Sequence, residues 1–124
     1  MNTRRQLRVA EAIHRELSLL LMREVRDPRL ADVTITAVRV TPDLLIARIF
    51  FTVLGDSEAQ KEALAGLEHA AGFLRTQLSA QVRLRSAPEL VFEVDKSVAY
   101  GRRIEELLDQ IAEDSRARDG SESE

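Results

Sequence analysis

The segment EVRDPRLADVTITAVRVTPDL, residues 24–44, changes its structural pattern twice. It leaves a helical pattern at Asp27-Pro28, because a residue that precedes proline is pushed out of the α region. It then alternates in the manner of a strand, and reaches a second turn at Pro42-Asp43, a pair that suits tight turns. The segment therefore predicts the end of a helix, a turn, and the first strand of a hairpin.

The residues before this segment predict one amphipathic helix from about Arg4 to Arg26. At about 100° per residue, its apolar side chains fall in one arc that we expect to face the core: Val9, Ile13, Leu17, Leu20 and Leu21. The opposite side carries an arginine row, formed by Arg4, Arg8, Arg15 and Arg26 and flanked by Arg5 and Arg23.

The residues after the segment predict a second strand, a long helix, a third strand and a final helix. In VTITAVRV the apolar phase shifts by one residue near Thr36 and Ala37, which predicts a β-bulge. LLIARIFFTVL completes the hairpin. A helix then begins with Ser57 as the expected N-cap and Gln60 as its capping-box partner, and Gly72 within it predicts a kink. ELVFEVD and SVAYGRRIEELLDQIAED predict the last strand and helix.

This order predicts an α+β two-layer domain, in which helices cover one face of a three-stranded sheet. A chain of 124 residues is long enough for one domain with a substantial core. We expect this domain to occupy residues 1–113. Residues 114–124 have no apolar residue beyond Ala117, so we expect them to form a disordered acidic tail.

The composition excludes several classes of protein. The chain has no cysteine, which excludes disulfides, thiol chemistry and cysteine-ligated zinc and fits the cytoplasm. No apolar run is long enough for a membrane span or a secretory leader. His14 and His69 show no catalytic or metal-binding spacing, and no glycine-rich phosphate loop is present. We therefore expect neither an enzyme nor a cofactor, metal or small-molecule site.

The basic residues suggest binding to phosphate. Residues 104–124 hold two Arg and eight Asp or Glu, so residues 1–103 are net positive, and sixteen of the eighteen basic residues are Arg. The candidates for contacts to RNA phosphates are Arg4, Arg5, Arg8, Arg15, Arg29, Arg75, Arg83, Arg85, Arg102 and Arg103. The alternative is that these are ordinary solvated charges, since the sequence does not show that they converge.

The aromatic residues favour a structured RNA over a single strand. Phe51 and Phe92 are in the core phase of their strands, and we expect Phe73 to be buried. Only Phe50 and Tyr100 remain, too few for a platform that stacks unpaired bases. Contact with a folded RNA through its backbone and shape fits better.

Several motifs together resemble the bacterial ribosome-binding factor A family over residues 4–112. They are DPRL, TPDL, the Ala-x-Gly of Ala70-Ala71-Gly72, RLR-x-x-PEL and D-x-S. The resemblance implies a type II KH-like fold of order α-β-β-α-kink-α-β, with a C-terminal helix added. In this family the Ala-x-Gly kink stands where ordinary KH domains carry Gly-x-x-Gly, and no two glycines here are three apart.

The resemblance also implies a function. Members of the family bind the free small (30S) ribosomal subunit rather than the joined ribosome. They help late maturation and processing of 16S rRNA near its 5′ terminal helix and neck, and matter for growth in the cold. We expect a monomeric, non-enzymatic assembly factor of this kind. The alternatives are a protein-protein module of a ribosomal complex without RNA contact, and a small-molecule-sensing domain. For Gly72, close helix–sheet packing and RNA contact both stay open.

Overall fold

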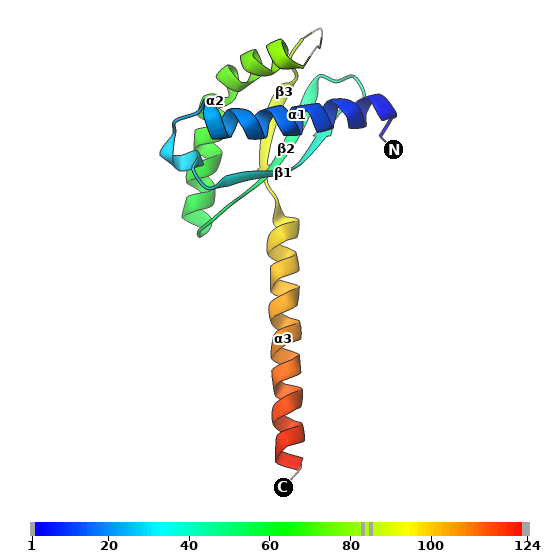
Figure 1. Ribbon diagram of the computed structural model, residues 1–124, viewed down its shortest axis with the longest axis vertical. Coiled ribbons are helices and arrows are strands. Elements are labelled where there is room, and N and C mark those ends of the chain that lie inside the picture. Colours follow the sequence, from blue (N-terminus) through cyan, green and yellow to red (C-terminus); the bar gives the residue numbers. More distant parts are fainter. Residues whose placement is uncertain (1, 83, 85, 123–124) are drawn as a thin grey trace. The chain divides into compact units, whose positions relative to one another are not determined.

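The computed structural model describes the backbone of residues 2–82, 84 and 86–122, and the side chains of all of these except 98–102 and 116–122. By the proximity of its Cα atoms the chain forms two compact units, residues 1–94 and 95–124. The elements in chain order are α1 (Arg4–Arg23), the 3-10 turn η1 (Pro28–Leu30), β1 (Val33–Val40), β2 (Ile46–Val53), α2 (Ser57–Gln81), β3 (Glu89–Val94) and α3 (Lys96–Glu122) (Figure 1).

The sheet has the order β1-β2-β3, with β1 antiparallel and β3 parallel to the central β2. The register passes from Ile35 opposite Phe51 to Ala37 opposite Phe50, so Thr36 is an extra residue in β1. The predicted bulge is therefore confirmed. It explains how the apolar residues on both sides of Thr36 share one core in spite of their shifted phase.

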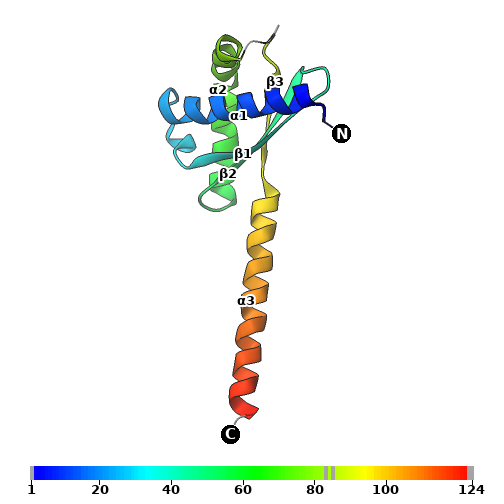
Figure 2. The same cartoon turned by 45° about the vertical axis from the view of Figure 1, so that its right-hand side comes forward.

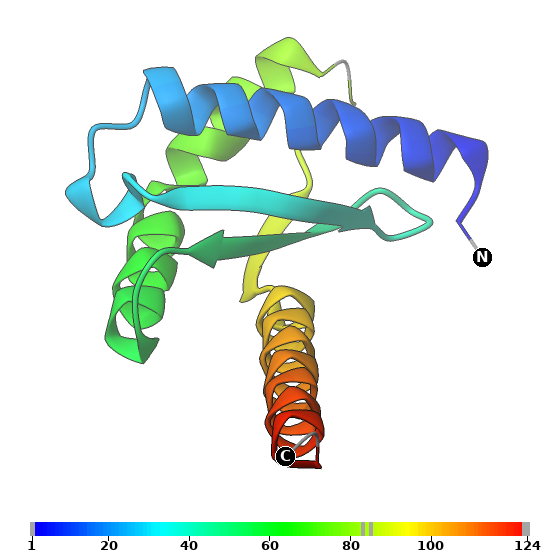
Figure 3. The same ribbon diagram turned by 60° about the horizontal axis from the view of Figure 1, so that its bottom comes forward.

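One face of the sheet is buried under α1 and α2, and this confirms the predicted two-layer α+β fold. In Figure 3, α1 lies alongside β1. The opposite face of the sheet carries exposed residues such as Arg39, Arg48 and Val91. The largest apolar core side chains with an exposed fraction of 1% or less are Ile13, Leu17, Ile49, Phe51, Leu67, Leu74 and Leu78.

The first turn of α1 is fixed to the sheet by Gln6. Its side-chain oxygen accepts a hydrogen bond from the Thr3 backbone N–H at 2.9 Å, while the Thr3 hydroxyl oxygen accepts one from the Gln6 N–H at 3.2 Å. This is a capping box. The Gln6 amide nitrogen also donates to the Val40 carbonyl at 3.0 Å, and the side chain is buried. One residue therefore caps the helix and ties it to the end of β1.

We predict that Gln6→Glu lowers the free energy of unfolding by about 1–3 kcal/mol, because it keeps the cap acceptor but removes the donor to a buried carbonyl. Urea denaturation measures this. Thr3→Ala serves as the control, since it removes only the cap and should cost about 1 kcal/mol. Equal stability of Gln6→Glu and the parent would show that the bond to Val40 contributes nothing.

Two predicted helix boundaries were wrong. Asp56, rather than Ser57, is the N-cap of α2, and its carboxylate accepts from the Ala59 N–H at 3.0 Å. Asp56 follows Gly55, whose φ of 124° turns the chain into the helix. The first helix ends at Arg23 and not near Arg26, because the chain must turn before Asp27 caps η1.

The predicted kink lies within one continuous helix, since α2 is helical throughout and its ribbon bends midway (Figures 1 and 2). Leu67, Leu74 and Leu78 of its predicted apolar stripe are buried. Phe73, which we expected to be buried, is 44% exposed. It precedes Leu74 by one residue, or about 100° around the helix, and so points away from the stripe.

The helix α3 forms most of the second unit. It is helical to Glu122, past the predicted domain boundary at residue 113, and its apolar residues Leu107, Leu108 and Ile111 are exposed. The backbone of residues 114–122 is helical in the structure. Whether the acidic residues 114–124 are disordered in solution stays a prediction. Within the described part of the chain, no helix combines the length and apolarity needed to cross a membrane.

Candidate nucleic-acid interface

The arginine row of α1 points away from the core. Burial of Ile13 and Leu17 on one side of the helix leaves Arg4, Arg8 and Arg15 exposed on the other. Arg15 lies 3.8 Å from a Glu16 carboxylate oxygen but its side chain is 66% exposed, so water weakens this pair. Among the described residues, no acid forms an ion pair with Arg4 or Arg8. These guanidinium groups are therefore available to phosphates.

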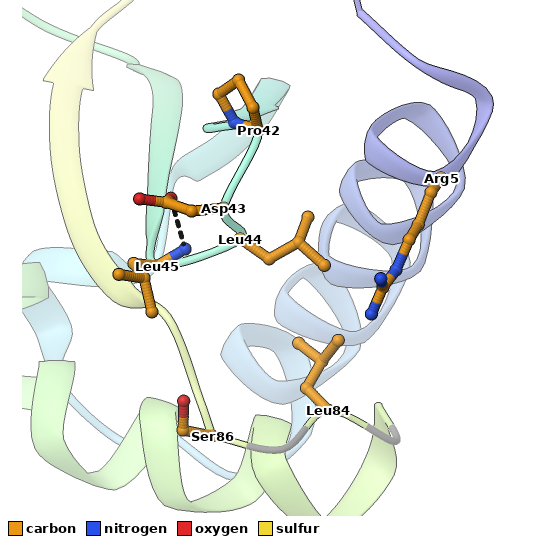
Figure 4. Close-up of a pocket in the computed structure, with 7 residues that line it drawn as sticks. All are labelled: Arg5, Pro42, Asp43, Leu44, Leu45, Leu84 and Ser86. Carbon is orange, nitrogen blue, oxygen red and sulfur yellow. Dashed lines mark hydrogen bonds between the residues drawn. The ribbon is translucent and has the colours of Figure 1, made fainter.

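Arg5 lies at the rim of a pocket in the first unit. The pocket has a volume of about 580 Å³ and is lined by Arg5, Pro42, Asp43, Leu44, Leu45, Leu84 and Ser86. Three elements meet here: the first turns of α1, the β1–β2 turn, and the connection from α2 to β3. Figure 4 shows the side chains of Arg5, Leu44 and Leu84 pointing into a common space. The pocket thus joins a cation to apolar walls.

Arg29 is held within the fold. Its guanidinium Nη2 lies 2.7 Å from an Asp27 carboxylate oxygen, and its Nε and backbone N–H donate to the same carboxylate. The hydrogen bond from the Arg29 side chain is the main reason why the pKa of Asp27 lies below its usual value. An arginine engaged in this way is less available to RNA than the free arginines of α1.

We predict that Asp27→Asn destabilises the protein at neutral pH and that the difference disappears in acid. The folded-state pKa of Asp27 is lowered, so its stabilisation is present above the ordinary value of 3.8 and is lost as the pH falls below that value. Urea denaturation over this range measures the effect. Asp32→Asn, at an exposed position after the same turn, is the control and should change stability little. A deficit of Asp27→Asn that does not depend on pH would contradict the assignment.

Arg75 also has a structural partner. Its Nε donates to the Pro88 carbonyl at 3.0 Å and its Nη2 to the Ala87 carbonyl at 3.1 Å. Arg75 thereby fixes the end of the α2–β3 connection to α2. It also lines a shallow groove with small residues, namely Gly72, Thr76, Ser79, Ser86 and Ala87.

The remaining four candidate arginines do not belong to the described part of the α1 arginine row. Arg83 and Arg85 lie outside the described residues, and so does the side chain of Arg102. Arg103 is exposed on α3, in the second unit. The structure thus brings Arg4, Arg5 and Arg8 together within the first turns of α1, and holds Arg29 and Arg75 by intramolecular bonds.

Close packing occurs at Gly66 and not at Gly72. A Cβ atom added to Gly66 would lie 3.0 Å from a methyl carbon of Leu30 and 3.4 Å from Arg29. One added to Gly72 would meet no atom of the described residues within 4 Å. Close helix–sheet packing, one of the two interpretations of Gly72, is therefore wrong. Gly66 lets η1 approach α2. The three residues Ala70, Ala71 and Gly72 stay a predicted kink motif, and their RNA contact stays a prediction.

We predict different effects of alanine on stability at these two glycines. Gly72→Ala should stabilise the protein by up to about 1 kcal/mol, because alanine favours a helix and has room here. Gly66→Ala should not show this gain, since its Cβ would press on buried Leu30, and overpacking costs about 1–3 kcal/mol. Thermal unfolding compares the two variants. Equal stabilisation by both would disprove the close approach at Gly66.

The open face of the sheet holds a cluster that the sequence analysis missed. Arg39 and Arg48 are paired across β1 and β2, and their guanidinium carbons lie 5.9 and 5.2 Å from the ring centroid of Phe50. Arg48 also forms a 2.7 Å ion pair with Glu93. Strand alternation already placed both arginines opposite the core, so this signal was available.

The two histidines lie apart from the arginine row, and one of them has a structural partner. His14 is bound through Nε2 to the Ile35 carbonyl at 2.9 Å, beside the bulge, and His69 is exposed. Among the described residues, no group of three or more His, Asp or Glu side chains is placed to hold a metal ion.

The fold defines the chain as a KH-like domain, because the solved structures that it matches share this architecture. The crystal structure of ribosome-binding factor A from Thermus thermophilus aligns with a TM-score of 0.65 and 27% identity, over 72% of this chain and 93% of that one. A Thermotoga maritima candidate for the same factor, solved by NMR, gives a TM-score of 0.66 and 33% identity, over 75% and 90%. A Thermus thermophilus homology model fitted into the cryo-EM map of a 30S complex gives 0.56 and 25%, over 77% and 97%.

Sequence comparison identifies the particular family. The profile for ribosome-binding factor A matches residues 5–108. The Geobacter metallireducens protein of that name is 46% identical over 94% of this chain and 98% of its own length. The Brevibacillus brevis protein of that name is 44% identical over 98% and 100%. The chain belongs to the ribosome-binding factor A family.

Proposed function

We propose that the protein binds the free small ribosomal subunit and assists the late maturation of its 16S rRNA. The observation that carries this proposal is the family match over residues 5–108, which includes nearly all of the folded first unit. A relative of 25% identity has been fitted into a 30S complex, which supports the same partner here. We place the protein in the cytoplasm, where ribosomes assemble, and infer that it acts near the 5′ terminal helix and neck and matters for growth in the cold.

The binding chemistry that we propose is contact between arginines and RNA phosphates. Arg4, Arg5 and Arg8 are exposed, free of ion pairs among the described residues, and rigidly presented by a capped helix. Arg15 extends this surface by two turns. The mechanism is non-enzymatic: a protein that binds one arrangement of the RNA more tightly than another shifts the RNA towards that arrangement.

We predict that Arg4→Glu, Arg8→Glu and Arg15→Glu together weaken binding to purified 30S subunits. Each phosphate contact adds roughly 0.7–0.9 to the magnitude of the log–log salt slope, so replacing all three arginines should reduce that slope by about 2–3. Co-sedimentation at rising salt measures both quantities, and circular dichroism checks that the fold is kept.

A matched pair of single variants supplies the control. Arg8→Glu and Lys61→Glu change the net charge equally, and the Lys61 side chain is 76% exposed on α2, with its amine 3.7 Å from a Glu58 carboxylate oxygen. Only Arg8→Glu should flatten the slope. Equal slopes for the triple variant and the parent would remove the row of α1 from the interface. Binding to ribosomal proteins in place of rRNA would favour the protein-protein alternative.

A further inference from the structure

The pocket beside Arg5 contains the one backbone conformation in the described chain that a non-glycine residue adopts at positive φ. Leu44 has a φ of 62°, in the left-handed region. Glycine, or asparagine, adopts this region more readily, and a bulky residue there is an outlier. Such outliers persist where the surrounding structure over-determines them, and they concentrate at binding sites.

Hydrogen bonds in the turn hold Leu44 in this conformation. Its N–H donates to the Thr41 carbonyl at 2.9 Å. One Asp43 carboxylate oxygen accepts from the Thr41 hydroxyl at 2.6 Å and from the Leu45 N–H at 3.1 Å. These bonds also lower the pKa of Asp43, with the Thr41 hydroxyl as the main cause. The turn thus directs the Leu44 side chain into the pocket, towards Arg5 and Leu84 (Figure 4).

Size and chemistry limit what the pocket can take. Its volume of about 580 Å³ falls in the range of small-molecule sites, about 300–1,000 Å³. Leu44 and Leu84 offer apolar surface to a flat group. Arg5 offers at the rim a guanidinium that forms no ion pair with any described residue, and Asp43 and Ser86 offer polar edges. If the pocket held an apolar side chain of another protein, Arg5 would have no partner of opposite charge. If it held a phosphate ion alone, the two leucines would have no apolar partner.

We propose that this pocket holds one unpaired nucleotide of the ribosomal RNA, with its base against Leu44 and Leu84 and its phosphate against Arg5. The inference rests on the proposed function and adds a specific subsite to it. Enzymes that extrude a base hold it between aromatic or apolar side chains, so the lack of a row of exposed rings is no obstacle for a single base. The phosphates bound by the α1 row then fix the position, and the base selects the RNA arrangement.

The central test uses Leu44→Asn in the full chain. Leu44 is partly buried against the core, but asparagine tolerates the left-handed region, which offsets the lost apolar contact, so the variant should stay folded. Circular dichroism checks this, and Leu44→Gly provides a second variant of the same kind. We expect affinity for 30S subunits to fall about tenfold with an unchanged salt slope, because the base loses the apolar surface of the leucine, whose burial is worth roughly tenfold or more, while every phosphate contact is kept. Arg5→Gln should weaken binding and reduce the slope by about 0.7–0.9.

The control is Leu54→Asn, which removes a leucine that is 72% exposed and lies outside the pocket. It should leave binding unchanged. If the parent binds subunits and Leu44→Asn binds equally well, the pocket proposal is overturned while the proposed function stands. If the parent does not bind subunits, the proposed function itself fails.

A second measurement identifies the occupant. Methyl NMR spectra of the parent, titrated with adenosine or cytidine 5′-monophosphate, should show shifts at Leu44 and Leu84, and inorganic phosphate should not produce them. Absence of methyl shifts with any of the four nucleoside monophosphates at millimolar concentration would overturn the proposal. So would a Leu44→Asn variant that loses binding to subunits but keeps full binding to protein-free 16S rRNA, since the pocket would then take a protein side chain.

Discussion

Burial of one face of a three-stranded sheet under α1 and α2 is the constraint on which the rest of this structure depends. Ile13 and Leu17 of α1 have no exposed surface, nor do Ile49 and Phe51 of β2. Burying a side chain of this kind contributes about 1.5–3 kcal/mol, which is far more than an exposed ion pair contributes. The rotation of α1 is therefore set by its apolar side, and its arginines point outward as a consequence.

The arginines divide into two groups according to the partners that the fold gives them. Arg29 is bound by the Asp27 carboxylate within its own turn, whereas Arg75 is bound by two carbonyls and holds the α2–β3 connection against α2. Arg4, Arg5 and Arg8 have no such partner among the described residues. An arginine with an internal partner must lose it to meet a phosphate, whereas a free one only exchanges water. The two groups therefore differ in what their substitution would do, stability in one case and affinity in the other.

The sequence predicted those features that depend on periodicity. The bulge at Thr36, the sides of α1 and the order of helices and strands follow from patterns of period two or 3.6. The two turns follow from the restrictions that proline places on the backbone, and the KH-like fold was implied by the family resemblance. The sequence did not predict features that depend on a contact between distant segments. Gly66 packs on Leu30, 36 residues away. Gly72, which interrupts the apolar stripe of α2, would meet no described atom within 4 Å of an added Cβ. Phe73 was wrongly predicted to be buried, because it lies one residue before the buried Leu74 and therefore on another side of α2.

The candidate site shows the same division. The arginine row could be derived from the helical pattern of α1 alone. The pocket beside it is formed by three segments that lie far apart in the chain. Nothing in the sequence around Leu44 indicates that this residue has a positive φ. The two parts also differ in what they recognise. Phosphate contacts supply affinity that depends on salt and hardly on RNA sequence. A pocket for one base responds to whether that base is unpaired, which is a property of the RNA's folding state. A factor that combines both would bind immature RNA firmly and release it when the base becomes paired, because pairing removes the contact on which the preference between the two states depends.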